Sequence, residues 1–163
     1  MVVLPLFAYN WQVRDEWFAW CNQLSAEQLG KDRTGGPGSI LYTLFHIVDV
    51  EYSWIRGIMG ETDVVFNFED YNTLEKVCAL SHTLRSEIVD FLQTLAGGCQ
   101  EGLEEYVTVA WDENPYTKQE ILLHIIAHEI HHMGQLSVWA RELGLRPVSA
   151  NVIGRKWNLP LTD

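Results

Sequence analysis

Residues 117–136 decide the fold; they read Thr-Lys-Gln-Glu-Ile-Leu-Leu-His-Ile-Ile-Ala-His-Glu-Ile-His-His-Met-Gly-Gln-Leu. The opening Thr117-Lys-Gln-Glu120 is a capping box, in which the two side chains satisfy backbone amides that a helix start leaves free. Apolar residues then recur at helical spacing as far as Trp139. The pattern predicts a helix that begins at the capping box and ends at Gly144.

Three further segments show the same helical period, over residues 6–22, 39–57 and 72–95. Residues 31–38 are rich in glycine and predict a loop. Residues 103–111 have the β-branched and aromatic composition of a strand. Together these segments predict an all-α fold, a four-helix bundle with long connections and a short β-hairpin before the last helix.

The chain of 163 residues has the length of one domain. We expect residues 1–163 to form a single helical bundle that ends in a tail from about residue 147, with Trp157 as a candidate anchor. The cysteines, Cys21, Cys78 and Cys99, form no C-x-x-C pair and are typical of free thiols in a reducing compartment. With no signal-peptide pattern and no long apolar run, we expect a cytoplasmic protein without a membrane partner.

The formal net charge is −11, from 22 acidic and 11 basic residues. Nucleic-acid binding depends on clustered lysine and arginine, so this balance argues against a nucleic-acid partner. It also makes a highly anionic substrate less expected than a neutral or weakly charged one. The composition leaves 6 histidines as the most informative side chains.

The predicted last helix carries four of these histidines within nine residues, namely His124, His128, His131 and His132. Because a helix turns by about 100° per residue, His128 and His132 lie one above the other on the same face. Such an i, i+4 pair offers two imidazole nitrogens to one metal ion. We therefore predict that His128 and His132 bind a metal.

A third ligand is sought on another helix, because bundles build metal sites from inward-facing side chains of different helices. His46 lies in the middle of the second predicted helix among apolar neighbours. It is the candidate, with an unligated neutral imidazole as the alternative. Three protein ligands leave a position for water or substrate, as in catalytic rather than structural sites.

The segment His128-Glu129-Ile-His-His132 also matches H-E-x-x-H, the zinc-peptidase pattern in which the glutamate is the general base. The longer metzincin pattern fails, because Gln135 stands where it needs glycine. The chain also has no region that predicts a large substrate-binding sheet. A zinc peptidase is therefore only a remote alternative.

Two motifs resemble the DinB superfamily of DinB/YfiT-like metalloenzymes: Leu44-Phe-His46-Ile-Val, and His128-x-x-x-His132-Met-Gly-Gln135-Leu. The family's second motif is usually H-x-x-x-H-R-G-Q-[IL], and Met133 departs from it. The resemblance covers nearly the whole chain. It implies a bundle with a long crossover connection, a homodimer, and a divalent metal on His46, His128 and His132. Zinc or nickel is expected first, with manganese or iron as alternatives.

The resemblance further implies a metal-dependent enzyme acting on a small molecule, with thiol S-transfer and hydrolysis both open. The thiol would be of low molecular weight. A non-catalytic metal-binding stress protein is the alternative. Asp49 and Gln135 each follow a predicted ligand by three residues and are candidates to orient it. Glu129 is a candidate base, with an ordinary solvated helix position as its alternative. His124 could line the site, while His82 and His131 have no assigned role.

Overall fold

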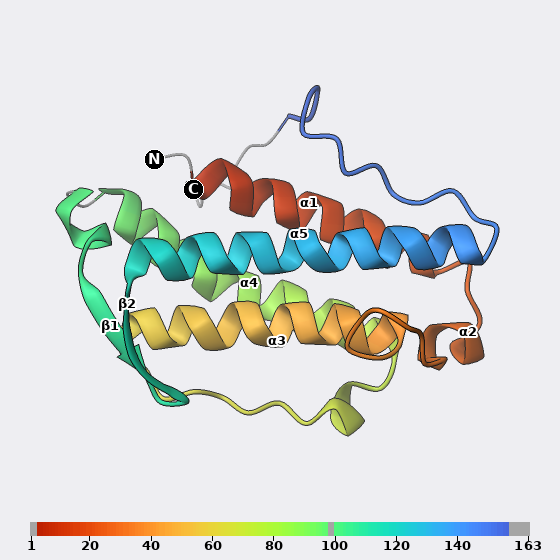
Figure 1. Cartoon of the computed structure of the whole chain (residues 1–163), viewed down its shortest axis with the longest axis horizontal. Coiled ribbons are helices and arrows are strands. Elements are labelled where there is room, and N and C mark those ends of the chain that lie inside the picture. The colour runs from red at the N-terminus through yellow and green to blue at the C-terminus, as the bar shows by residue number, and fades with distance from the viewer. Residues whose placement is uncertain (1–2, 98–99, 157–163) are drawn as a thin grey trace.

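The computed structural model describes residues 3–97 and 100–156 of the chain, and it confirms the predicted helical bundle (Figure 1). The helices are α1 (Val3–Cys21), α2 (Ala26–Gly30), α3 (Ile40–Met59), α4 (Leu74–Gly97) and α5 (Lys118–Glu142). Two 3₁₀ turns, η1 (Phe68–Tyr71) and η2 (Gln100–Leu103), lie in the connections. Strands β1 (Tyr106–Val109) and β2 (Asp112–Thr117) precede α5.

The four long helices form a closed ring of neighbours. Helix α3 packs against α4 and α5, and α1 packs against the same two helices. Figure 1 shows α1 and α5 running in one direction and α3 and α4 in the other. Because α3 and α4 are parallel, the connection between them must cross the length of the bundle, and η1 lies within it. The long connections predicted from the sequence are therefore what sets the topology.

Local capping explains where the two helices that carry the predicted ligands begin. Thr117 and Glu120 form the predicted capping box at the start of α5. The hydroxyl of Ser39 accepts a hydrogen bond from the Tyr42 amide at the start of α3. Helix α3 ends at Gly60, whose φ of 73° is the left-handed conformation that glycine adopts without strain.

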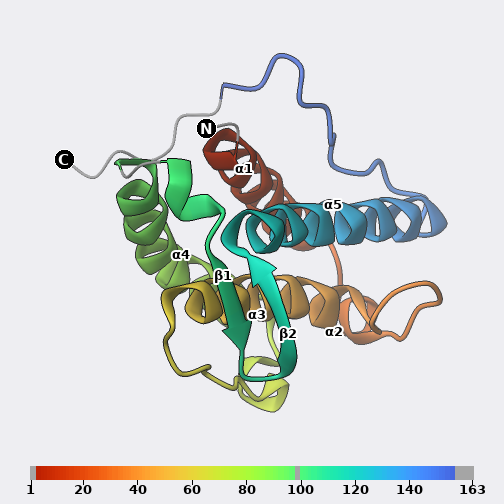
Figure 2. The same ribbon diagram turned by 60° about the vertical axis from the view of Figure 1, so that its left-hand side comes forward.

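The predicted hairpin is present, with a second strand that composition did not reveal. Strands β1 and β2 are antiparallel, and a register shift lies between Val107 and Val109 (Figure 2). The hairpin lies against α3 at Gly57, where an added Cβ would come within 2.6 Å of Val109. Glycine is needed at this position because the strand approaches the helix backbone so closely. Strand β2 ends at Thr117, so the hairpin leads directly into α5.

The bundle interior consists of two apolar layers. One surrounds Trp17, Leu44 and Leu136, and the other surrounds Ile55 and Leu122. In α3, α4 and α5 the residues of the two layers are separated along the sequence by a buried polar residue, which is Glu51, Ser81 and Glu129 respectively, and α1 contributes the buried Arg14. These four side chains contact one another through Arg14 and form a polar layer at the middle of the bundle.

The described part of the predicted tail lies along α1 (Figure 1). The Tyr9 hydroxyl donates to the carbonyl of Ala150 at 2.8 Å, and Arg155 pairs with Glu16 at 2.7 Å. Cys99 and Trp157 lie outside the described residues. No helix in the described part of the chain is long and apolar enough to cross a membrane.

Candidate metal centre

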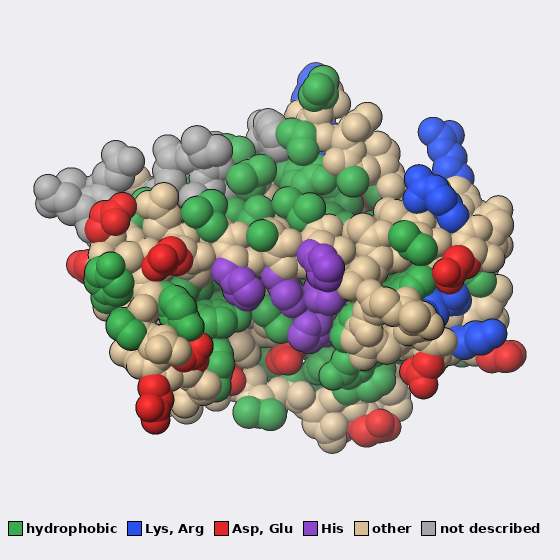
Figure 3. Space-filling view, viewed as in Figure 1, with side chains coloured by type: hydrophobic (Ala, Val, Ile, Leu, Met, Phe, Trp, Pro, Cys, Tyr) green, Lys and Arg blue, Asp and Glu red, His purple; other side chains and the backbone are tan. Residues whose placement is uncertain are grey.

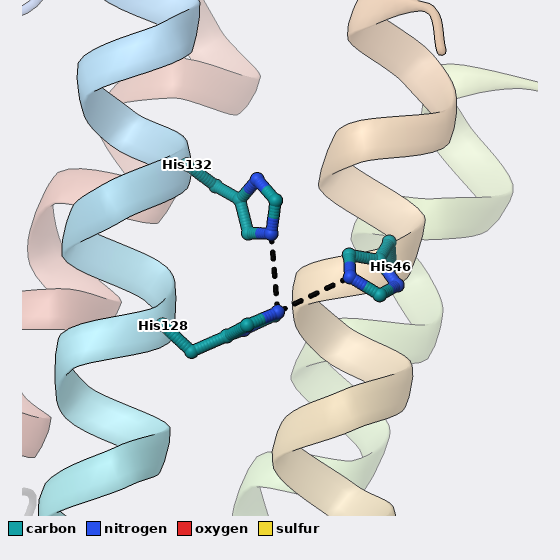
Figure 4. Close-up of side chains that lie close together, drawn as sticks. All are labelled: His46, His128 and His132. Carbon is teal, nitrogen blue, oxygen red and sulfur yellow. Dashed lines mark hydrogen bonds between the residues drawn. The ribbon is translucent and has the colours of Figure 1, made fainter. Parts of the chain in front are cut away.

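The predicted ligands His46, His128 and His132 meet in the groove between α3 and α5 (Figure 4). The Nε2 atom of His128 lies 3.1 Å from the Nε2 of His46 and 3.1 Å from the Nε2 of His132. Tetrahedral zinc with Zn–N bonds of about 2.0–2.1 Å places its nitrogens about 3.3 Å apart. Two of the three separations are close to this value, and all three nitrogens lie within 4.8 Å of one another, so the group could hold a metal.

Hydrogen bonding alone does not satisfy this cluster. The Nδ1 of His132 lies 2.7 Å from Oε1 of Gln135, an oxygen that can only accept, so this nitrogen carries the proton. The Nε2 of a neutral His132 then has only a lone pair, and the one proton on the Nε2 of His128 would have to serve two neighbours. A cation that accepts all three lone pairs removes this conflict. The donor set thus fits a metal better than it fits three unligated imidazoles.

All three imidazoles favour the neutral form, which is the form that binds metal. Burial and the neighbouring histidines lower the pKa of His128 to about 3. Burial, followed by the charge of His132, lowers the pKa of His46. Burial also lowers the pKa of His132, although its hydrogen bond to Gln135 acts in the opposite direction. The cluster therefore presents lone pairs, not protons, to an incoming cation at neutral pH.

These pKa shifts predict that the metal-free protein loses stability in acid. From pH 6.5, the ordinary pKa of histidine, down to the value of about 3 for His128, the unfolded chain binds a proton that the folded chain excludes. The free energy of unfolding should therefore fall as the pH drops below about 6.5. Urea unfolding with EDTA at pH 7.5 and 5.5 measures this loss, which should be smaller in His128→Gln. Equal losses in the variant and the wild type would contradict the prediction.

Gln135, a candidate to orient a ligand, contacts His132. Besides accepting from the His132 ring, its amide nitrogen lies 3.0 Å from Nε2 of the exposed His131. The glycine-rich loop packs beside it, since a Cβ added at Gly36 would come within 2.4 Å of the Trp139 ring and 3.0 Å of the Gln135 oxygen. The Trp139 indole in turn donates to the carbonyl of Thr34. Loop and helix together hold the amide against the imidazole.

Replacing Gln135 with leucine should weaken zinc binding by about 10–100-fold, because an orienting acceptor for a ligating imidazole is lost. Gln135→Glu keeps an acceptor oxygen at this position and should retain most of the affinity. The matched control is Gln119→Leu, at an exposed position on the same helix. Competition with a fluorescent zinc chelator measures all three affinities. Wild-type affinity in Gln135→Leu would show that the amide does not orient the ligand.

Asp49, the second candidate to orient a ligand, makes no hydrogen bond to His46 within the described residues. It is half-buried, and burial together with the charge of Asp63 raises its pKa to about 6. The side chain is thus a carboxyl group that titrates near neutral pH, one helical turn from a ligand.

The side chain of Glu129 is not placed to act as a base at the histidine cluster. Its side chain is buried, and its carboxylate receives two hydrogen bonds from Arg14, at 2.7 and 2.5 Å. Arg14 also donates to Glu51 at 2.7 Å. Burial disfavours the Arg14 charge, but the two carboxylates outweigh it and raise the pKa of Arg14. With its carboxylate held in this network, Glu129 is neither a solvated residue nor available as the base of an H-E-x-x-H peptidase.

The other histidines occupy different surroundings. His124 is exposed, and its ring centroid lies 5.9 Å from that of His128 and 5.4 Å from that of Trp54. His131 contacts Gln135, and His82 lies on α4 at 3.3 Å from Asp15, apart from the cluster. Figure 3 shows the histidine side chains gathered in the middle of one face of the molecule.

The chain is similar to a protein family, to a bacterial protein and to a solved structure. The model of the DinB family matches residues 1–159. A protein of Bacillus subtilis (strain 168), described as uncharacterized protein YizA, is 60% identical over 154 residues, which cover 94% of this chain and 95% of that protein. The crystal structure of a DinB-like protein from Bacillus cereus ATCC 10987 has a TM-score of 0.61 at 18% identity, covering 84% of this chain and 89% of that one. The last similarity bears on the fold alone.

Proposed function

The chain belongs to the DinB family, and from this premise we propose that it is a divalent-metal-dependent enzyme that acts on a small molecule. The observation that carries the proposal is the convergence of three imidazole nitrogens from α3 and α5. Three protein ligands leave coordination positions for a reactant, whereas structural zinc sites are filled by four. Zinc or nickel is the proposed metal, with manganese or iron as alternatives.

A bound divalent ion lowers the pKa of a water or thiol that it coordinates, which supplies a nucleophile near neutral pH. The protein's own groups hold and move the protons. His46, His128 and His132 remain neutral, and Gln135 fixes the proton of His132 on Nδ1. Asp49, with a pKa of about 6, is the proposed acceptor for the proton that the nucleophile releases.

The proposed reactions are S-transfer from a low-molecular-weight thiol to an electrophile, and hydrolysis, in which water takes the place of the thiol. In both reactions the nucleophile, a thiol or a water molecule, loses a proton at the same site. In either reaction the nucleophile forms a bond to an electrophilic carbon, whose leaving group departs with the bonding electrons. The arrangement of the chain's residues is common to the two reactions.

The test is an activity screen on protein loaded separately with zinc and with nickel. The protein is incubated with a set of electrophiles and esters, with and without small thiols, and products are followed by mass spectrometry. We expect a conjugation or hydrolysis product that His46→Ala and His128→Ala abolish and that Asp49→Asn reduces. His82→Gln is the control, because His82 lies away from the cluster.

The outcomes separate the proposed enzyme from its alternative. A product that forms equally in wild type and His46→Ala would contradict a role for the cluster in catalysis. Stoichiometric metal that depends on the three histidines, with no turnover across the screen, would instead support a non-catalytic metal-binding protein.

A further inference from the structure

A row of aromatic rings begins at the three histidines and continues toward the hairpin. On α5, His132, His128 and His124 follow one another at intervals of one turn. Helix α3 runs antiparallel to α5 (Figure 1), and its His46 contacts the rings of His128 and His132 while its Trp54 contacts the ring of His124. The ring centroids of His46 and His128 are 4.9 Å apart, and those of Trp54 and His124 are 5.4 Å apart. The rings of His124 and His128, with centroids 5.9 Å apart, link these two pairs, so an unbroken row of ring contacts connects the metal centre to Trp54.

A cavity of about 380 Å³ lies at this end, between α3, α5 and β2. This volume is that of a small-molecule site. It is lined by Trp54, Asp112, Tyr116, Glu120, Ile121 and His124. The rings of Trp54 and Tyr116 meet nearly at right angles, with centroids 6.3 Å apart. The cavity therefore offers aromatic faces beside the row of histidines.

Two carboxylates, those of Asp112 and Glu120, line the cavity. Hydrogen bonds from the Asn114 amide and the Tyr116 hydroxyl lower the pKa of Asp112, and hydrogen bonds from Thr117 lower that of Glu120. Both carboxylates are thus ionised at neutral pH. None of the described residues that line the cavity is a lysine or an arginine. Aromatic faces combined with carboxylates attract organic cations through cation–π and Coulomb interactions and disfavour anions.

We propose that this cavity binds the ammonium group and adjoining apolar part of a small organic cation. As a statement about substrate, this inference rests on the proposed function: the cationic end lies between Trp54 and the carboxylates, and the reacting end points along the groove toward His128. The centroids of His124 and His128 are 5.9 Å apart, so the two ends of such a ligand are separated by roughly one helical turn. As a statement about binding, it stands without any metal.

The experiment titrates metal-free protein with three probes of similar size: benzyltrimethylammonium, benzyl alcohol and phenylacetate. NMR spectra follow the indole N–H signals, and the Trp54 signal is identified by its loss in Trp54→Phe. We expect benzyltrimethylammonium to shift the Trp54 signal and to bind at least about tenfold more tightly than benzyl alcohol, with no binding of phenylacetate. The same order of affinity is expected after zinc loading.

Two variants test the carboxylates without removing their hydrogen-bonding oxygens. The double variant Asp112→Asn/Glu120→Gln should weaken the binding of benzyltrimethylammonium about tenfold. Glu113→Gln is the matched control, because Glu113 is an exposed carboxylate of the same hairpin that does not line the cavity. It should leave the affinity unchanged within about twofold.

Three results would overturn the inference: equal affinity for the cation and the alcohol, tighter binding of phenylacetate, or wild-type affinity in the double variant. Because the probes are titrated into metal-free protein, each of these results leaves the metal proposal untouched. Conversely, a protein that binds the cation but none of zinc, nickel, manganese and iron would overturn the proposed function and keep the cavity assignment.

Discussion

Replacing Arg14 with methionine is expected to lower the free energy of unfolding by about 3–5 kcal/mol, the typical cost of leaving a buried charge without its partner. The side chain is 1% exposed and is the counter-ion that the structure provides for both Glu51 and Glu129. Without it, two carboxylates remain at the middle of the bundle. Urea unfolding, monitored by far-UV circular dichroism at pH 7.5, measures the change.

A control variant and a rescue variant test whether the uncompensated buried charges cause the loss of stability. Arg56→Met removes ion pairs with two exposed carboxylates, those of the 56% exposed Glu61 and the 40% exposed Glu87, and should cost about 1 kcal/mol. Adding Glu51→Leu and Glu129→Met to Arg14→Met removes the uncompensated charges and should restore most of the lost stability. If Arg14→Met costs no more than Arg56→Met, the polar layer does not stabilise the bundle in the way proposed.

Zinc should raise the unfolding temperature of the wild-type protein and leave that of His128→Gln unchanged. An ion that binds only the folded chain at 100 times its dissociation constant adds about 2.7 kcal/mol. His128 contributes the central nitrogen of the cluster, so its loss removes one ligand and the link between the other two. Thermal unfolding with zinc and with EDTA measures the difference.

His124→Gln is the matched control for this prediction, since His124 lies one turn before His128 on the same helix but outside the cluster of three. It should keep the zinc-dependent rise seen in the wild type. An equal rise in His128→Gln would mean that zinc binds elsewhere on the chain.

Much of the fold followed from short-range signals in the sequence. The capping box at Thr117 is local, and it defines where the helix that carries His128 and His132 begins. The i, i+4 spacing of His128 and His132 is also local, so helical geometry alone placed these two imidazoles together. His46 required the further premise that α3 and α5 are neighbours, which the structure confirms.

The polar layer shows what sequence patterns could not provide. From the sequence, Glu129 appeared to be a solvated residue or a base beside His128, and nothing in the pattern connected it with Arg14. Which carboxylates lie opposite an arginine depends on how α1, α3 and α5 are rotated in the bundle, and this is a long-range property. The sequence feature that could have indicated the polar layer is one charged residue on the apolar face of each of these three helices.

The second strand was also out of reach, for a different reason. Residues 112–117 read Asp-Glu-Asn-Pro-Tyr-Thr, a composition that favours a turn over a strand. Pairing with β1 and packing of Val109 against Gly57 outweigh that preference. Because this strand forms one wall of the cavity beside Trp54, the candidate cation site could be recognised only from the structure.

The central claim is that His46, His128 and His132 hold one divalent ion, and the most direct measurement is anomalous X-ray diffraction from crystals grown with zinc. We expect a single strong anomalous peak between α3 and α5, at about 2.0–2.1 Å from each of the three Nε2 atoms. Crystals of fully zinc-saturated protein with no peak at these nitrogens, or with zinc bound only by other side chains, would contradict it.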